Sequence, residues 1–352
     1  MPRRAALRQR LRERPRLRDR PRSRYCDPVA ILIDPPRWPA HGTIWSHLVS
    51  DVSYDELHLF ARGVAIPRRG FDLDHYDVPA AMFDVVVATG AQAVESRVLL
   101  FRLRGAGLRV RQADRHVAAR RHRKAFLRAE WAALGVGLGV GDGAAWSRRG
   151  LPGAGVGLGA AWGSLGEDLL LRWSEPHRRY HDVVHLHDVL LSLDQLADLG
   201  EAVPPAVLLA AWFHDAVYDG AAGEDERRSA ALAVVELPRV GVAAAATHEV
   251  ARLVLATTPG TERSTDHAAM VLGDADLAIL ASGPKRYAAY AAAVREEYAH
   301  VLEPDFRHGR AAILEGFLRA PRLYGTGAAH ARWEERARMN LAGEITELRG
   351  GP

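Results

Sequence analysis

The sequence has little cysteine and no long apolar run. Cys26 is the single cysteine among 352 residues, which excludes an intramolecular disulfide framework and a cysteine-rich zinc site. A membrane-spanning helix needs about 18 consecutive apolar residues, and no such run occurs. The first residues also lack the apolar segment of a secretory signal. We therefore expect a cytoplasmic protein with no membrane partner.

Lysine is almost absent, and the basic charge is concentrated at one end. Lys124 and Lys285 are the two lysines, and eleven arginines fall within residues 1–24. Their charge exceeds the net charge of +4 for the whole chain, so the remainder is acidic on balance. No aromatic residue interleaves the arginines, and prolines interrupt any helix. Residues 1–26 are predicted to be a disordered Arg-rich tail, and a nucleic-acid partner, the alternative for such a tail, is not favoured.

Residues 27–111 predict a small α/β domain, because strand and helix patterns alternate there. Val29–Ile33 has the pattern of a buried strand, and Tyr54–Val64 that of a helix with Ser53 as its N-cap. The further expected elements are helices at Pro79–Thr89 and Ser96–Gly105 and short strands at Ala91–Glu95 and Leu108–Arg111.

Residues 112–166 are expected to be a Gly-rich linker. A helix is indicated at Arg115–Leu134, and twelve glycines follow within residues 135–166. Neither a G-x-G-x-x-G pattern nor a P-loop occurs among them, so the glycines do not predict a phosphate-binding loop.

Residues 167–350 predict an all-α domain, because apolar residues recur there at helical spacing and turn residues separate the segments. The expected helices are Val183–Leu199, Pro205–Val217, Ser229–Leu237, His248–Ala256, His267–Leu280, Tyr287–Val301, Gly309–Leu318 and Ala331–Leu348.

The helical region contains a histidine–aspartate pair that ends an apolar helix. His214 and Asp215 directly follow the apolar run of residues 207–213. Burial of both side chains is costly unless each finds a partner. A divalent metal ion would be such a partner, and a hydrogen bond within the pair that only fixes the core is the alternative.

Two other segments offer the same residue types. His181 and His185 are four residues apart and share one helix face, and Asp274 and Asp276 stand within an otherwise apolar helix. Three helices thus each carry His or Asp on an apolar face, which is how helical folds build metal sites in their cores.

The order His, His-Asp, Asp resembles the signature of the HD-domain metal-dependent phosphohydrolases. Residues 173–181, 211–219 and 274–280 carry the likeness, and residues 287–298, 306–318 and 336–344 extend it. The resemblance implies an HD-type helical fold whose metal ligands are His185, His214, Asp215 and Asp276. His181 and Asp274 would then support the ligands, although each remains an alternative ligand to His185 and Asp276 respectively.

The implied reaction is hydrolysis of a nucleotide or another small phosphate ester by metal-activated water. The cofactor would be a divalent ion: Mn, Fe, Zn, Ni, Co or Mg. Asp215 and Asp219 are the candidate catalytic acids, and three arginines are candidate phosphate-binding residues, namely Arg178, Arg295 and Arg310.

All four ligand types are present and favour the hydrolase, but two departures from the family pattern leave an alternative open. Asp225-Glu226 stands where the family usually has Asn-Glu, and no histidine closely follows Thr257. The alternative is a catalytically degenerate HD module that binds a nucleotide or supports the N-terminal domain. The sequence leaves the oligomeric state open.

The N-terminal region resembles a bacterial family of unknown function numbered 4031. The likeness is carried by residues 34–38, 45–51, 56–58 and 74–77 and implies no activity. This region nevertheless contains several potential ligands or acid–base groups, with a structural polar network as the alternative. The candidate site consists of His47, Asp51, His75 and Asp77, with His58 nearby in the sequence.

Overall fold

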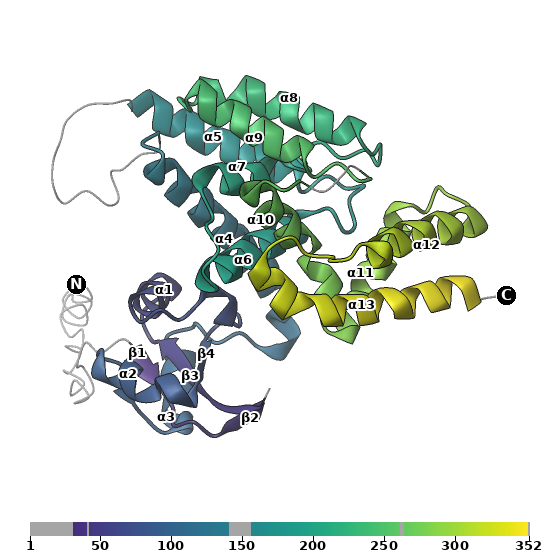
Figure 1. Cartoon of the computed structure of the whole chain (residues 1–352). Helices are drawn as coiled ribbons and strands as arrows, with labels where there is room; N and C mark the ends of the chain where they lie inside the picture. Colours follow the sequence, from purple (N-terminus) through teal and green to yellow (C-terminus); the bar gives the residue numbers. More distant parts are fainter. Residues whose placement is uncertain (1–30, 41, 141–155, 261–263, 351–352) are drawn as a thin grey trace, which may run out of the picture. The chain divides into compact units, whose positions relative to one another are not determined.

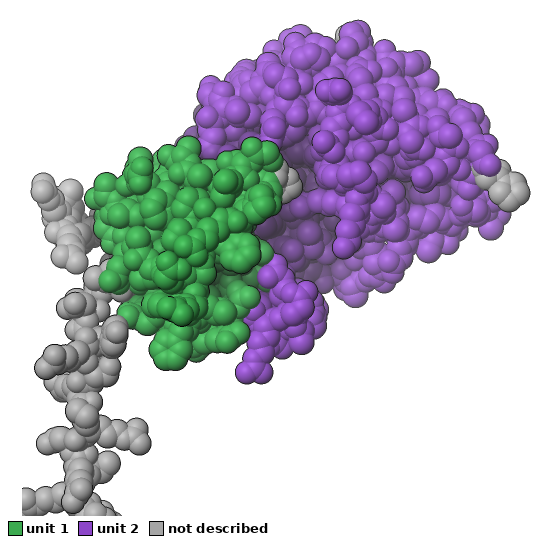
Figure 2. All heavy atoms as spheres, turned by 90° about the horizontal axis from the view of Figure 1, so that it is seen from below, with its two compact units in different colours: residues 1–66, 70–109 green, residues 67–69, 110–352 purple. Residues whose placement is uncertain are grey.

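The computed structural model describes residues 31–40, 42–140, 156–260 and 264–350. The predicted Arg-rich tail, Cys26 and the start of the first predicted strand lie outside these residues. The chain divides into two compact units, residues 1–66 with 70–109 and residues 67–69 with 110–352 (Figure 2). Each is described by itself.

The first unit is a small α/β fold, as the sequence predicts (Figure 1). Its strands are β1 (Ile31–Ile33), β2 (Trp38–Ala40), β3 (Thr43–Ser50), β4 (Tyr76–Pro79) and β5 (Gln92–Ala93). Its helices are α1 (Tyr54–Gly63), α2 (Phe83–Ala88) and α3 (Ser96–Gly105). Strand β3 is antiparallel to β1, β2 and β4, and β1 is parallel to β5.

Alternation along β1 buries side chains on both faces of the sheet at this strand. Ile31 and Ile33 pack into one cluster with Leu57 of α1 and Val86 of α2. Leu32 packs on the opposite face with residues of α3. Because successive strand side chains point to opposite faces, a three-residue apolar strand can serve two cores.

Several predicted elements of the first unit are confirmed, one is present in part and one is wrong. Ser53 caps α1 by accepting a hydrogen bond from the Glu56 N–H at 3.1 Å. Of the helix expected over Pro79–Thr89, Pro79 pairs with β3 as the end of β4, Ala80–Met82 form a 3-10 helix, and α2 begins at Phe83. Residues 108–111 form no strand.

The second unit is helical throughout its described residues (Figure 1). Its helices are α4 (Arg115–Gly137), α5 (Val156–Arg172), α6 (Val183–Asp198), α7 (Pro205–Phe213), α8 (Glu224–Arg239), α9 (Ala244–Leu255), α10 (His267–Asp276), α11 (Pro284–Glu297), α12 (Glu303–Arg319) and α13 (Gly327–Gly350). A 3-10 segment, Leu277–Ala281, follows α10. None of the described helices combines the length and apolar character that a membrane crossing requires.

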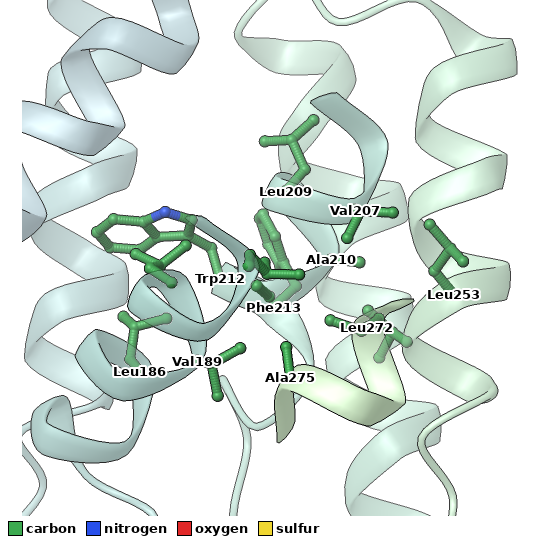
Figure 3. Close-up of a cluster of buried hydrophobic side chains, with 14 of the residues drawn as sticks. Leu186, Val189, Val207, Leu209, Ala210, Trp212, Phe213, Leu253, Leu272 and Ala275 are labelled. Atoms are coloured by element: carbon green, nitrogen blue, oxygen red, sulfur yellow. The ribbon is translucent and has the colours of Figure 1, made fainter. Parts of the chain in front are cut away.

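Helix α7 lies at the centre of the helical core. Figure 3 shows its side chains packed against those of α6, α9 and α10. Trp212 and Phe213, the last two residues of α7, are 1% and 0% exposed. This central position carries the next residues, His214 and Asp215, into the interior.

The segment expected to be a Gly-rich linker is helical on both sides of residues 141–155, which lie outside the described residues. Helices α4 and α5 pack together through Trp131 and Trp162, whose ring centroids are 4.2 Å apart at an angle of 10°. Each indole N–H donates to the backbone carbonyl of the other tryptophan, at 2.8 and 2.9 Å. A Cβ on Gly135 would lie 2.4 Å from Trp162, and one on Gly166 would lie 2.3 Å from Trp131. Glycine at these positions permits close helix packing rather than a flexible connection.

Candidate metal centre

Four side chains from three helices converge inside the helical unit. His185 lies in α6, His214 and Asp215 follow α7, and Asp276 ends α10. His185 Nε2 is 3.0 Å from Asp276 Oδ1, 3.1 Å from His214 Nε2 and 3.8 Å from Asp215 Oδ2. His214 Nε2 is 3.3 Å from Asp215 Oδ2 and 3.7 Å from Asp276 Oδ1. The structure thus brings together the four residues proposed as ligands from the sequence.

The donor set suits a divalent transition metal. Nδ1 of His214 is 2.9 Å from the carbonyl oxygen of Ala211; because a carbonyl only accepts, Nδ1 carries a proton, and Nε2 is the ring nitrogen that faces the cluster and could bind a metal. Two imidazole nitrogens and two carboxylates are common ligands of such ions. Metal–ligand bonds of about 2.1 Å place neighbouring ligand atoms roughly 3.0 to 3.4 Å apart, close to the separations found here.

The buried acids of this cluster remain ionised. Burial raises the pKa of Asp276, but hydrogen bonds and charge interactions with His185 and His214 outweigh it and hold that pKa below its usual range. Burial likewise opposes ionisation of Asp215, whose pKa is nevertheless lowered to about 2 by His214. Burial lowers the pKa of His214, whereas Asp215 and Asp276 raise it above its ordinary value. Both carboxylates are therefore ionised, and a metal ion at this place would displace the proton that they hold on His214.

Glu297 of α11 supports this site, although the sequence did not single it out. Its carboxylate is 2.7 Å from His181 Nδ1 and accepts backbone N–H groups of Arg179, Tyr180 and His181 at 2.8, 2.8 and 2.9 Å. Burial raises the pKa of Glu297, but the hydrogen bond to His181 reverses this and holds the pKa at about 2. The ring of His181 lies 5.6 Å from that of His185. An ionised acid thus fixes the orientation of an imidazole beside the cluster.

Asp274 has a different place from the one expected. It is 3% exposed and accepts hydrogen bonds from the backbone N–H of Gly325 and from the N–H and hydroxyl of Thr326, at 2.7 to 2.8 Å. Asp274 therefore holds the loop before α13. These hydrogen bonds explain, without a metal ion, why an acidic residue occurs in an otherwise apolar helix.

Asp219 and the three candidate arginines have protein partners. Asp219 forms a surface ion pair with Arg228. Arg178 is buried and donates to the carbonyl oxygens of His181, Asp215 and Ala216. Arg295 bonds Glu303 and the carbonyls of Tyr298 and Val301. Arg310 is held by Glu344 and by the hydroxyl of Tyr290, at 2.8 and 2.9 Å.

The acidic pair Asp225-Glu226 shapes the chain that follows Asp215. Asp225 is 4% exposed and accepts the backbone N–H groups of Asp219 and Ala221 at 2.9 and 2.8 Å. Glu226 accepts that of Gly223 at 2.5 Å. The two carboxylates thus hold the turn that leads into α8, and Asp225 does so by binding backbone N–H groups.

A cavity of about 920 Å³ adjoins the four-residue cluster. Asp276 and His181 line it, together with residues of α10, α11, α12 and the loops around Thr257 and Arg322. Among the described residues, Arg310 lines this cavity, whereas Arg178 and Arg295 do not. The volume is in the range of small-molecule binding sites, and Asp276, with a side chain 24% exposed, connects the cluster with it.

The candidate residues of the first unit only partly converge. His47, His75 and Asp77 each place one potential ligand atom within 4.8 Å of the others. Asp51 instead bonds Arg102 at 2.5 Å, and His58 lies 2.9 Å from the hydroxyl of Tyr76. The sequence also contained Asp34 and Asp74, whose contacts with His47 and His75 were not foreseen.

Comparisons with known proteins identify a match within the first unit. Residues 31–106 match the model of family DUF4031, described as a protein of unknown function. No curated protein and no solved structure matches the chain. The similarity of the helical unit to HD domains remains a prediction from the sequence.

Proposed function

We propose that the helical unit is an HD-type metal-dependent phosphohydrolase that acts on a nucleotide or another small phosphate ester. The observation that carries this proposal is the convergence of His185, His214, Asp215 and Asp276 beside a 920 Å³ cavity. The imidazole and carboxylate groups of this cluster come from three helices, and the side chains of His185 and His214 are nearly inaccessible. A divalent ion would balance the charge of the carboxylates.

The four side chains would hold the ion, and neighbouring groups fix His214 and the backbone of Asp215. A divalent ion bound there supplies a Lewis acid that polarises a phosphoryl oxygen and makes water nucleophilic near neutral pH. The carbonyl of Ala211 orients His214, and Arg178 holds the backbone carbonyl of Asp215 at 2.7 Å. Such supporting contacts determine how well a site binds its metal.

His181 and the cavity wall would bind the substrate. Glu297 fixes Nδ1 of His181, so an oriented imidazole lies at the wall and suits a hydrogen bond with a phosphate oxygen. Tyr290, Tyr298 and Phe306 give the cavity aromatic surface, on which a nucleobase or another flat group can pack. Arg310 adds a guanidinium that Glu344 and Tyr290 hold in place.

The test combines metal content with phosphate release. Protein purified without chelator or a nickel column is analysed by elemental mass spectrometry, and nucleoside mono-, di- and triphosphates and p-nitrophenyl phosphate are screened as substrates. We expect bound transition metal in the helical unit and hydrolysis of at least one ester. Asp215→Ala should lose that metal and reduce kcat/KM on the order of 10³-fold.

Asp168→Ala is the matched control, because Asp168 is an exposed aspartate of α5 in the same unit. It should retain both metal and activity. Metal without hydrolysis of any ester would favour the catalytically degenerate binding module instead. Failure of the wild-type helical unit to take up manganese, iron or zinc would refute both the metal centre and the hydrolase.

A further inference from the structure

One face of the sheet in the first unit gathers two histidines and an aspartate. His47 of β3 pairs directly with Asp77 of β4, and His75 lies two residues before Asp77. Side chains two residues apart in an extended chain share a face. His75 Nε2 is 3.4 Å and His47 Nε2 is 4.0 Å from the same oxygen, Asp77 Oδ1. The two imidazole rings meet edge to face, with centroids 4.9 Å apart.

Each imidazole is oriented from behind by an inaccessible carboxylate. Asp34, 0% exposed, has Oδ2 at 3.2 Å from His47 Nδ1 and also accepts the backbone N–H of His47 at 2.6 Å. Asp74, 1% exposed, has Oδ1 at 2.7 Å from His75 Nδ1. A carboxylate bound to Nδ1 leaves Nε2 as the ring nitrogen that could coordinate a metal. Both Nε2 atoms are therefore directed to the side where Asp77 lies.

Asp34 is itself held in place by the surrounding fold. Its Oδ2 accepts hydrogen bonds from the Ser96 hydroxyl at 2.7 Å and from the Trp38 indole N–H at 3.3 Å. An acid held by several donors is fixed in position and can orient an imidazole.

The local charge favours a cation. Three carboxylates, those of Asp34, Asp74 and Asp77, lie around the two imidazoles, and one guanidinium, that of Arg109, is 3.1 Å from Asp74. Carboxylates thus outnumber the cationic side chain at this place. The side chains of His47 and Asp77 are 27% and 46% exposed, so the ligand atoms can be reached from solvent.

We infer that His47 Nε2, His75 Nε2 and Asp77 Oδ1 form a second metal site, for a zinc-class divalent ion with an open coordination position. Two histidines and one carboxylate are the ligand set of sites that keep a position for water or substrate. The side chain of Asp77 is the most exposed of the three and can adjust to close the ligand set. This site is independent of the centre proposed in the helical unit.

The alternative is a polar network that only stabilises the sheet. The two possibilities differ at Nε2 of His75. In a polar network this nitrogen would carry a proton and face Asp77, whereas a metal ion would replace that proton. Stoichiometry and the visible spectrum of Co²⁺ distinguish an ion with protein ligands from a network without one.

The experiment is equilibrium dialysis of the full chain against Zn²⁺ and Co²⁺, with elemental analysis of four proteins. The wild type should bind two equivalents, one in each unit. Asp77→Asn and Asp215→Ala should each bind one. Asp84→Asn, which changes an exposed aspartate of α2 in the same unit, should bind two. If the helical unit binds no metal, the expected values become one for the wild type and none for Asp77→Asn, so the two proposals fail separately.

His75→Ala in the Co²⁺-loaded chain provides the second readout. The variant should show altered ligand-field bands for one Co²⁺ and should bind that ion at least tenfold more weakly than the wild type. Circular dichroism verifies that the variant is folded. If His75→Ala unfolds, the decision rests on Asp77→Asn, which preserves side-chain shape. Equal stoichiometry, affinity and spectrum for Asp77→Asn and the wild type would overturn the inference.

Discussion

The side chain of Arg178 is charged and has no exposed surface, and its contacts hold the chain around the candidate metal centre in place. The guanidinium donates to the carbonyl oxygens of His181, Asp215 and Ala216 and to Glu175. It also lies 5.4 Å from the ring centre of Trp173. A planar fork with several donors suits this cluster of carbonyls, whereas an ammonium does not. The arginine is therefore a structural support for the chain on both sides of the cluster.

Replacement of Arg178 by Lys should reduce stability and metal binding together. The lysine keeps the charge but leaves buried carbonyls without donors, and we expect a loss of about 2 to 4 kcal/mol in the free energy of unfolding. Urea denaturation and metal titration measure the two effects. Arg227→Lys changes an exposed arginine paired with Glu224 and should stay within about 0.5 kcal/mol of wild type. Equal stability of the two variants would contradict the role given to Arg178.

At the residue scale, the sequence predicts candidate ligand residues but not the residues that hydrogen-bond to them. His185, His214, Asp215 and Asp276 could be selected because they interrupt apolar helices and match a known order of ligands. Glu297 could not, because an acid near the end of a polar helix resembles any surface glutamate until the fold brings it to His181. Asp34 likewise stands in an ordinary Asp-Pro turn, and its contact with His47 depends on the pairing of β1 with β3.

Helices α4 and α5 owe their close packing to glycines that face tryptophans. Gly166 of α5 lies against Trp131, whereas Gly163 of the same helix has no atom within 4 Å of an added Cβ. Glycine in a helix costs about 1 kcal/mol relative to alanine. The two positions therefore predict opposite effects of one substitution.

Gly166→Ala should destabilise the helical unit by about 1 to 3 kcal/mol, because its Cβ would overlap the indole of Trp131 and the helices would have to separate. Gly163→Ala should stabilise it by about 0.5 to 1 kcal/mol. Thermal unfolding of both variants provides the comparison. A shift of the same sign in both would show that helix propensity, rather than contact with Trp131, determines the response.

At the element scale, helix type could be predicted well and connections could not. Ser96–Gly105 was predicted with the bounds that the structure has, and every helix expected in residues 167–350 has a counterpart. Gly135 and Gly166 of the expected linker lie in helices against tryptophans, because a glycine in a helix can be required by a bulky neighbour; residues 141–155 lie outside the described residues. The helix expected from Pro79 starts later than predicted, because Pro79 itself pairs with β3.

The whole chain combines two units whose candidate metal sites differ in construction. One lies within a helical core and uses four side chains, and the other lies on an accessible sheet face and uses three. A ligand that binds only the folded state stabilises it in proportion to the logarithm of its concentration. The two sites should therefore respond separately to removal of metal.

Chelation should lower the thermal midpoint of the helical unit. An ion at 100 times its Kd contributes about 2.7 kcal/mol, and its loss should lower the Tm by roughly 5 to 10 °C for a unit of this size. Differential scanning calorimetry with and without EDTA measures this shift. In the Asp215→Ala variant, EDTA should not change the thermal midpoint of the helical unit. An identical midpoint for wild-type protein with and without EDTA would contradict a bound ion.

The stacked pair Trp131 and Trp162 also has an optical consequence. Trp131 lies against Trp162 at 4.2 Å and against Trp212 at 4.9 Å, so these indoles are held in fixed positions within a chiral fold. All helices contribute to the far-ultraviolet spectrum, whereas the near-ultraviolet signal of Trp162 in this environment depends on the docking of α4 and α5. The protein thus carries an intrinsic chromophore that reports the separation of two particular helices without any added label.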